Sequence, residues 1–266
     1  MIGVQELLKE YQSKKDVLFQ DPLFVQEYEE KFLIRFTYES TVMEGNTLTY
    51  QETEDLLLRG ITPGGKNLRE IYEQVNHKRA FAYINEQVQL HNELNEERIL
   101  KIHQILTENI FRGGVYRSVQ VRIAGAKHEC PYPEELPDKL RSFYNDLDKK
   151  MAVCGLPESD LDAFRLACWA HAEFVAIHPF LDGNGRTSRM IMNYLLIEHG
   201  YVPVSVPLER KREYGNALDH YACTGQLDEF MAIIEDLERE ELKYLIECQR
   251  NLAAEGLQKG EKCDAT

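Results

Sequence analysis

The sequence lacks a long hydrophobic run, paired cysteines and an excess of basic residues. No apolar run approaches the ~20 residues that a membrane helix needs, and the N-terminus has no secretory apolar core. The six cysteines are scattered without a C-x-x-C pair, which favours reduced thiols over a zinc site or disulfide framework. Lys and Arg number 31 against 45 Asp and Glu, a net charge of −14, so a broad nucleic-acid-binding face is not expected. We therefore expect a cytoplasmic protein that binds neither membrane nor nucleic acid.

What the sequence does contain is mostly helical pattern. Its 266 residues, 43% hydrophobic and 29% charged, are enough for one large domain or two small ones. From Pro22 to Met43 large apolar residues recur at spacings near three, four and seven, which predicts an amphipathic helix. Gly45-Asn46 is expected to end it, since both residues tolerate the left-handed conformation common after a helix. Similar patterns along the chain predict an all-α protein.

The segment from Gly113 to Pro137 differs from the rest. Apolar and polar residues alternate there with a period of two, and Gly125 supplies a turn, so the segment is the best β-hairpin candidate. The alternating residues are Val119, Gln120, Val121, Arg122 and Ile123.

Residues 177–189 combine a helix end, a turn and a helix start. The proline after His178 pushes the chain out of a helix, and a cluster of turn residues follows at 182–185. The next helix then begins with Arg186 and Arg189 in its first turns. Free backbone N–H groups, the positive end of the helix dipole and two guanidinium groups converge there, which predicts a phosphate site.

Two further residues add chemistry to this predicted phosphate site. Asp182 would repel a phosphate unless Mg²⁺ lies between them, and Mg²⁺ commonly binds one or two carboxylates together with phosphate oxygens. His178 can accept a proton near pH 7. Each feature alone has an ordinary explanation, such as a structural histidine, a simple helix start or surface arginines.

Together, the run HPFLDGNGRTSR at 178–189 resembles the Fic motif H-x-F-x-[DE]-G-N-G-R-x-x-R at every fixed position. The resemblance implies that His178 is the general base for a target hydroxyl attacking the α-phosphorus of ATP, and that Phe180 anchors the loop. It further implies Mg²⁺ on Asp182, the β-phosphate on Arg186 and the γ-phosphate on Arg189. The implied anion hole is formed by Gly183, Asn184 and Gly185, with Asn184 contacting the α-phosphate. Gly185 replaces the lysine of the phosphorylating branch and so favours nucleotidyl transfer.

The run Ser40-Thr41-Val42-Met43-Glu44-Gly45-Asn46 resembles the inhibitory motif [ST]-x-x-x-E-[GN] of the same family. Ser40 and Glu44 share a helix face. Glu44 is expected at a helix C-terminus, where the dipole disfavours negative charge, so it needs solvent or a cationic partner. The resemblance implies that this partner is Arg189, whereas a solvated surface glutamate is the alternative.

Two weaker resemblances complete the site. Gly114-Val115-Tyr116-Arg117 and the candidate hairpin resemble the Fic flap, which holds a target segment by strand addition, although a merely stabilising hairpin is the alternative. Residues 212–218 resemble the segment that closes the adenosine pocket, with Tyr214 and Asn216 as contacts. The family often has two adjacent tyrosines where this chain has Tyr214-Gly215, and ordinary packing is the alternative.

The resemblance as a whole implies an all-α Fic fold with a β-hairpin flap. The expected divisions are an N-terminal helical region at 1–93, a Fic core at 94–234, and a C-terminal helix with a frayed tail at 235–266. The implied activity is AMP transfer from ATP, with Mg²⁺, to a Tyr, Ser or Thr hydroxyl of a protein, including the chain itself. A homodimer is a further expectation. The open alternatives are AMP removal at the same site, another nucleotide donor, and a nucleotide-sensing regulator without catalysis.

Overall fold

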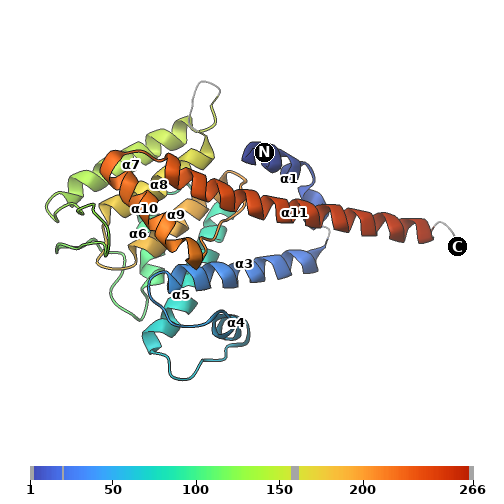
Figure 1. Cartoon of the computed structure of the whole chain (residues 1–266), viewed down its shortest axis with the longest axis horizontal. Helices are drawn as coiled ribbons and strands as arrows, with labels where there is room; N and C mark the ends of the chain where they lie inside the picture. Colours follow the sequence, from blue (N-terminus) through green and yellow to red (C-terminus); the bar gives the residue numbers. More distant parts are fainter. Residues whose placement is uncertain (1–2, 20, 157–161, 264–266) are drawn as a thin grey trace.

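The computed structural model describes residues 3–19, 21–156 and 162–263, and all regular structure in these residues is helical (Figure 1). This confirms the expected all-α class. The helices are α1 (Val4–Ser13), α2 (Lys15–Phe19), α3 (Pro22–Val42), α4 (Tyr50–Arg59), α5 (Leu68–Gln89), α6 (Glu96–Leu106), α7 (Leu136–Val153), α8 (Ala163–Ile177), α9 (Asn184–Glu198), α10 (Lys211–Thr224) and α11 (Asp228–Cys263), with a 3₁₀ turn at Leu208–Arg210 before α10.

Side-chain caps fix where several helices begin. The Asp21 carboxylate accepts hydrogen bonds from two backbone N–H groups at the start of α3. Thr49 and Glu52 form a reciprocal capping box on α4. The side chains of Asn95 at α6 and Asp162 at α8 each accept a hydrogen bond from the backbone N–H three residues further on. These caps satisfy N–H groups that the first helical turn leaves without partners.

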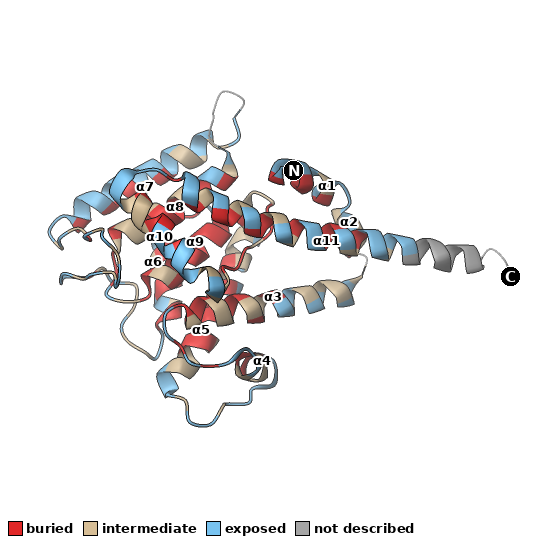
Figure 2. Ribbon diagram, viewed as in Figure 1, coloured by how far each residue is buried: buried red, intermediate tan, exposed pale blue. Residues whose placement is uncertain are grey.

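Helix α9 forms the centre of the molecule, because nearly every one of its residues is buried. Helix α8 packs along it, and α5, α6 and α3 contact it from other sides. Buried apolar side chains from Val4 in α1 to Ile246 in α11 belong to one cluster, seen as the red interior in Figure 2. The N-terminus of α9 is therefore held by helices from both halves of the chain.

Buried polar contacts fix α3 against α5. The Thr37 hydroxyl lies 3.0 Å from Nδ1 of His77, and the Gln74 amide donates to the Thr41 hydroxyl over 2.9 Å. At the end of α3, Gly45 has a φ of 99°, so the predicted helix stop is confirmed. Burial makes unpaired polar atoms costly, so these contacts favour one register of α3 on α5.

The long helix α11 runs across the molecule, with α1 alongside it (Figure 1). A C-terminal helix with a frayed tail was expected at 235–266, and the helix continues to Cys263. The last three residues of the predicted frayed tail, 264–266, lie outside the described residues.

No helix in the described ranges is long and apolar enough to span a membrane.

The predicted β-hairpin is absent from the flap segment, which we define as residues 114–133. This part of the described chain contains turns and bends but no strand. The segment has a first arm before Gly125 and a returning arm after it. Side chains rather than backbone groups connect these arms: the Arg117 guanidinium donates to Val119 O and to Pro131 O, and the Gln120 amide donates to Cys130 O. The alternating pattern therefore predicted the wrong backbone structure.

Two features of the returning arm explain the missing ladder. Pro131 and Pro133 have no N–H group, so they cannot donate to a partner strand. The N–H groups of Lys127 and His128 instead donate to one oxygen of Asp219 in α10, over 2.9 and 2.8 Å. At these four positions the backbone donor is thus either missing or bonded to α10.

Candidate active site

The loop between α8 and α9 contains the first half of the 178–189 motif and is held in place by aromatic packing. Phe180 is fully buried, and its ring stacks on His103 of α6 with centroids 3.6 Å apart and planes 1° apart. Gly114 N donates to Nδ1 of His103, so Nε2 carries the hydrogen that bonds Asp182 O at 2.9 Å. Burial lowers the pKa of His103 to about 4, which keeps it neutral in this role. The expected anchoring of the loop by Phe180 is consistent with this packing.

Asn184 closes the loop on itself. Its side-chain oxygen accepts from Phe180 N and its amide donates to Phe180 O, each over 2.8 Å. The side chain is buried, and both of its polar ends are occupied. With the side chain holding the loop, the backbone N–H of Asn184 at the start of α9 could contact a phosphate in its place.

Asp182 lies at the edge of the site with 39% of its side chain exposed. One oxygen accepts from Gly183 N at 2.6 Å and lies 3.5 Å from Arg186, and the other pairs with Arg69 of α5. Burial alone would raise the pKa of Asp182, but Arg186, the Gly183 N–H and Arg69 together lower it. The carboxylate is thus charged and faces cationic groups.

Arg186 is almost completely buried, yet much of its guanidinium has no hydrogen-bond partner. Its Nη1 lies 3.6 Å from Glu73 of α5, outside hydrogen-bond range, and neither Nε nor Nη1 is bonded within the described residues. A buried cation with unsatisfied donors is costly unless a ligand completes it. Together with the N–H groups that the first turn of α9 leaves without helical partners, Arg186 could bind an anion here.

Arg189 has the partner that the sequence predicted. Its Nη2 donates to Glu44 Oε1 at 2.7 Å, while Nε and Nη2 also donate to the hydroxyl and carbonyl of Ser40. Burial alone would raise the pKa of Glu44, but Arg189 lowers it. A Cβ atom added to Gly185 would overlap the Glu44 carboxylate, so this carboxylate rests directly on the first turn of α9.

His178 caps α8 in the left-handed conformation, with φ 50° and ψ 57°. Its Nδ1 lies 3.3 Å from Val175 O; because a carbonyl can only accept, Nδ1 carries the hydrogen and Nε2 has the free lone pair. Burial is the main cause that lowers the pKa of His178, so the ring is neutral at pH 7. Nε2 is therefore available as a base.

The two predicted adenosine contacts lie in different surroundings. Tyr214 is buried, with its hydroxyl 2.7 Å from Nε2 of His171, and burial raises its pKa even though the nearby Arg189 partly offsets this effect. Asn216 is exposed on α10. Tyr214 thus packs behind Arg189 rather than at an open pocket, and the structure does not bring it together with Asn216.

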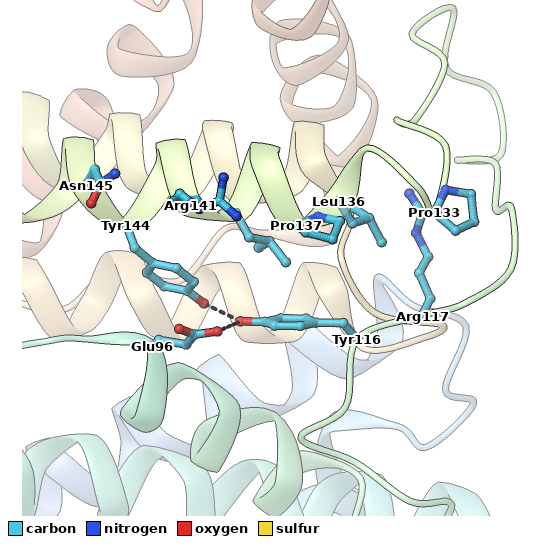
Figure 3. Close-up of a pocket in the computed structure, with 10 residues that line it drawn as sticks. Glu96, Tyr116, Arg117, Pro133, Leu136, Pro137, Arg141, Tyr144 and Asn145 are labelled. Carbon is cyan, nitrogen blue, oxygen red and sulfur yellow. Dashed lines mark hydrogen bonds between the residues drawn. The ribbon is translucent and has the colours of Figure 1, made fainter.

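The predicted flap residues Val119, Gln120 and Arg122 are exposed, whereas Val121 and Ile123 are partly buried. Beside the flap segment a pocket of about 510 Å³ lies against α7 (Figure 3). At its base the Tyr116 hydroxyl bonds Glu96 at 2.8 Å and Tyr144 at 2.9 Å. The Tyr116 ring also stacks on Phe180, so the pocket adjoins the loop of His178.

The sequence analysis did not assign several residues that contact the motif, among them Arg69, Glu73, His103 and Arg117. Three of them lie on α5 and α6, more than seventy residues before the motif residues they contact. Their side chains are common at helix surfaces, so no local pattern distinguishes them. Arg117 was visible only as part of the run that resembles a flap.

Comparison with known proteins gives similarity over most of the chain. Residues 93–196 match the Fic/DOC family. A protein of Drosophila persimilis named protein adenylyltransferase Fic is 33% identical over 201 residues, covering 75% of this chain and 38% of that protein. A Fic-domain-containing signalling protein from Bacteroides thetaiotaomicron has a similar structure, with a TM-score of 0.82, 25% identity, and coverage of 93% of this chain and 98% of that one. Fic-1 from C. elegans gives a TM-score of 0.73 at 25% identity, covering 91% and 71%.

Proposed function

This chain belongs to the Fic/DOC family through residues 93–196, and on that basis we propose that it transfers AMP from ATP to a hydroxyl group of a protein. The chain spans 38% of the length of the first curated relative, so the activity named for that longer protein needs support from the site itself. The observation that carries the proposal is the buried, incompletely bonded Arg186 at the N-terminus of α9, the helix that directly follows the loop of the neutral base His178. An anion site beside a base suits attack by a hydroxyl on a phosphate.

In the proposed reaction, Nε2 of His178 takes the proton of the target hydroxyl. The hydroxyl oxygen forms a bond to the α-phosphorus, and the bond from that phosphorus to the bridging oxygen of pyrophosphate breaks. Arg186 and the backbone N–H groups of the first turn of α9 hold the phosphates. Most of the acceleration would come from positioning and charge stabilisation, because the side chains are fixed before the nucleotide arrives.

Asp182 is the residue that would hold Mg²⁺. Within the described residues no group of three or more His, Cys, Asp or Glu could hold a metal ion alone. A single half-exposed carboxylate nevertheless fits Mg²⁺, which typically completes its coordination with phosphate oxygens and water. Bound there, Mg²⁺ would neutralise phosphate charge, and Asp182 would have to leave Arg69 to bind it.

We further propose that Glu44 inhibits transfer by occupying Arg189. The support is the 2.7 Å ion pair and the overlap between the Glu44 carboxylate and any atom added at Gly185. A γ-phosphate that needs Arg189 would compete with this carboxylate for the same donor. Nucleotide bound without that contact would lack one of its anchors.

Incubation of the protein with ATP labelled at the α-phosphate tests these proposals. Glu44→Gly should increase labelling of the chain itself or of added lysate proteins, and His178→Ala in that background should abolish it. Unchanged labelling by Glu44→Gly would contradict the inhibitory role. Labelling that survives His178→Ala would contradict the assignment of the base.

One observation favours a second activity, removal of AMP from a modified protein. Oε2 of Glu44 makes no hydrogen bond within the described residues, and 34% of the side chain is exposed, so this oxygen could align a water molecule. Release of AMP from a target that already carries it should then require Glu44. If Glu44→Gln releases AMP as fast as the unmodified chain, Glu44 does not align the water, and if the unmodified chain releases none, this second activity is wrong.

The finer parts of the proposal concern donor and assembly. Thermal shifts with equal concentrations of ATP, UTP, GTP and a phosphocholine nucleotide should rank the donors, since stabilisation of the folded state grows with the logarithm of ligand concentration over Kd. Light scattering on the purified chain should detect the expected homodimer.

A further inference from the structure

Arg117 connects three parts of the site that are separate in the sequence. Its side chain is buried, with 6% of the residue exposed. The guanidinium donates from Nε to His178 O over 2.9 Å, from Nη1 to Val119 O over 3.0 Å, and from Nη2 to Pro131 O over 2.6 Å. Its backbone N–H donates to Pro179 O over 2.9 Å. One residue therefore contacts the loop between α8 and α9 twice, the first arm of the flap segment through Val119 and Gln120, and the returning arm through Pro131.

Charge pairing does not explain this buried arginine. All the acceptors of its guanidinium are uncharged, and no carboxylate in the described part of the chain forms an ion pair with it. Burial lowers the pKa of Arg117, which reflects the cost of removing the cation from water. What an arginine supplies here is its planar fork of five donors, which reaches several carbonyl groups in fixed directions; a lysine ammonium cannot span them.

The backbone of His178 needs such support. A non-glycine residue in the left-handed conformation is strained and persists when surrounding contacts hold it. His178 N donates to Phe174 O at 3.0 Å within the helix end, whereas the carbonyl points away and is bonded by Arg117. Arg117 thus fixes the peptide group between His178 and Pro179, and through it the direction of the His178 imidazole.

We propose that Arg117 is a positioning residue that sets the orientation of His178 according to the conformation of the flap segment. When a target segment lies against the flap, its arms and the base are held by the same guanidinium. Figure 3 shows Arg117 beside Pro133, on the flap side of the pocket. The effect of Arg117 on catalysis rests on the proposed AMP transfer. Its hydrogen bonds to the flap segment and to His178 do not.

Hydrogen exchange tests the connection without requiring activity. Arg117→Lys keeps the charge and removes the fork, and Arg112→Lys, an exposed arginine five residues earlier, is the matched control. We expect Arg117→Lys to accelerate amide exchange about tenfold or more at 178–183 and 119–131 but not in α9. Unchanged exchange in these two segments, or equal acceleration throughout the chain, would overturn the proposal.

Kinetics in the Glu44→Gly background test the catalytic consequence. Arg117→Lys should lower kcat about tenfold or more and leave the KM for ATP within about twofold, whereas Arg112→Lys should change neither. Guanidinium added to Arg117→Ala should restore part of the rate, and ammonium should not. A normal kcat per folded molecule of Arg117→Lys would mean that Arg117 only stabilises the fold. If the Glu44→Gly parent transfers no AMP, the proposed function is wrong, and hydrogen exchange still decides the role of Arg117.

Discussion

Replacing Glu44 by Gln would test whether this carboxylate and a terminal phosphate compete for Arg189. The change keeps the shape of the side chain and removes its charge. Arg189 would retain its bonds to the hydroxyl and carbonyl of Ser40, so the guanidinium would stay in place with an incomplete set of partners. A γ-phosphate could then supply the missing negative charge.

The magnitude follows from the unequal exposure of the two partners. The Arg189 side chain is 2% exposed, whereas that of Glu44 is 34% exposed and partly screened by water. Exposed ion pairs contribute about 0–1 kcal/mol and breaking a buried one costs about 3–5 kcal/mol, so about 1–2 kcal/mol is a reasonable value here. ATP loses this amount in the wild type when it displaces Glu44, but ADP does not. Glu44→Gln should therefore increase the preference for ATP over ADP by about 5- to 30-fold.

Calorimetric titration of ATP and ADP into both proteins measures this ratio. Glu29→Gln on the exposed side of α3 is the control, because it removes the same charge away from the site. Without nucleotide, Glu44→Gln should melt about 2–6 °C lower than the wild type. An ATP to ADP ratio that is equal in wild type and Glu44→Gln would refute competition for Arg189.

Three further predictions concern the motif. Arg69→Ala removes a cation paired with Asp182 and should increase the affinity of the ATP complex for Mn²⁺ several-fold in a titration followed by electron paramagnetic resonance; unaltered affinity would show that Arg69 does not compete with the metal. Since burial lowers the pKa of His178 and the base must be neutral, the midpoint of the acid-side fall in transfer rate should lie below pH 6.5, and a midpoint above pH 7 in a rate–pH profile would oppose this assignment. Asn184→Ala removes two buried hydrogen bonds to Phe180 and should lower the free energy of unfolding by about 2 kcal/mol in urea denaturation; an unchanged value would show that these bonds do not stabilise the loop.

Local patterns in the sequence predicted much of the fold. The apolar spacing of α3 and the Gly45 stop, for example, depend on residues within a few positions of each other, and the structure has both. The flap segment shows where such patterns fail. Its period of two is the signal of a strand, but a strand also needs partner N–H groups, and Asp219 on a distant helix binds those of Lys127 and His128.

The candidate site also has one part that local sequence predicts and another that depends on tertiary packing. The motif from His178 to Arg189 is a continuous run, so the residue types and spacing indicated phosphate chemistry before any coordinates. The surroundings of that run depend on tertiary packing. Glu73 and Arg69 meet it only because α5 crosses α9, and the sequence has no local sign of that crossing. The occupied side chain of Asn184 is also a property of the folded loop.

Glu44 reaches Arg189 from a position 145 residues away in the same chain. Because donor and acceptor are connected covalently, their effective concentration is set by the fold and does not change when the protein is diluted or accumulates. Helix α3 is itself held on α5 through Thr41 and Gln74, so the carboxylate is not on a loose tether. The fraction of molecules with Arg189 occupied should thus be the same at every protein concentration. It would change only when something binds more tightly to the form in which α3 has moved.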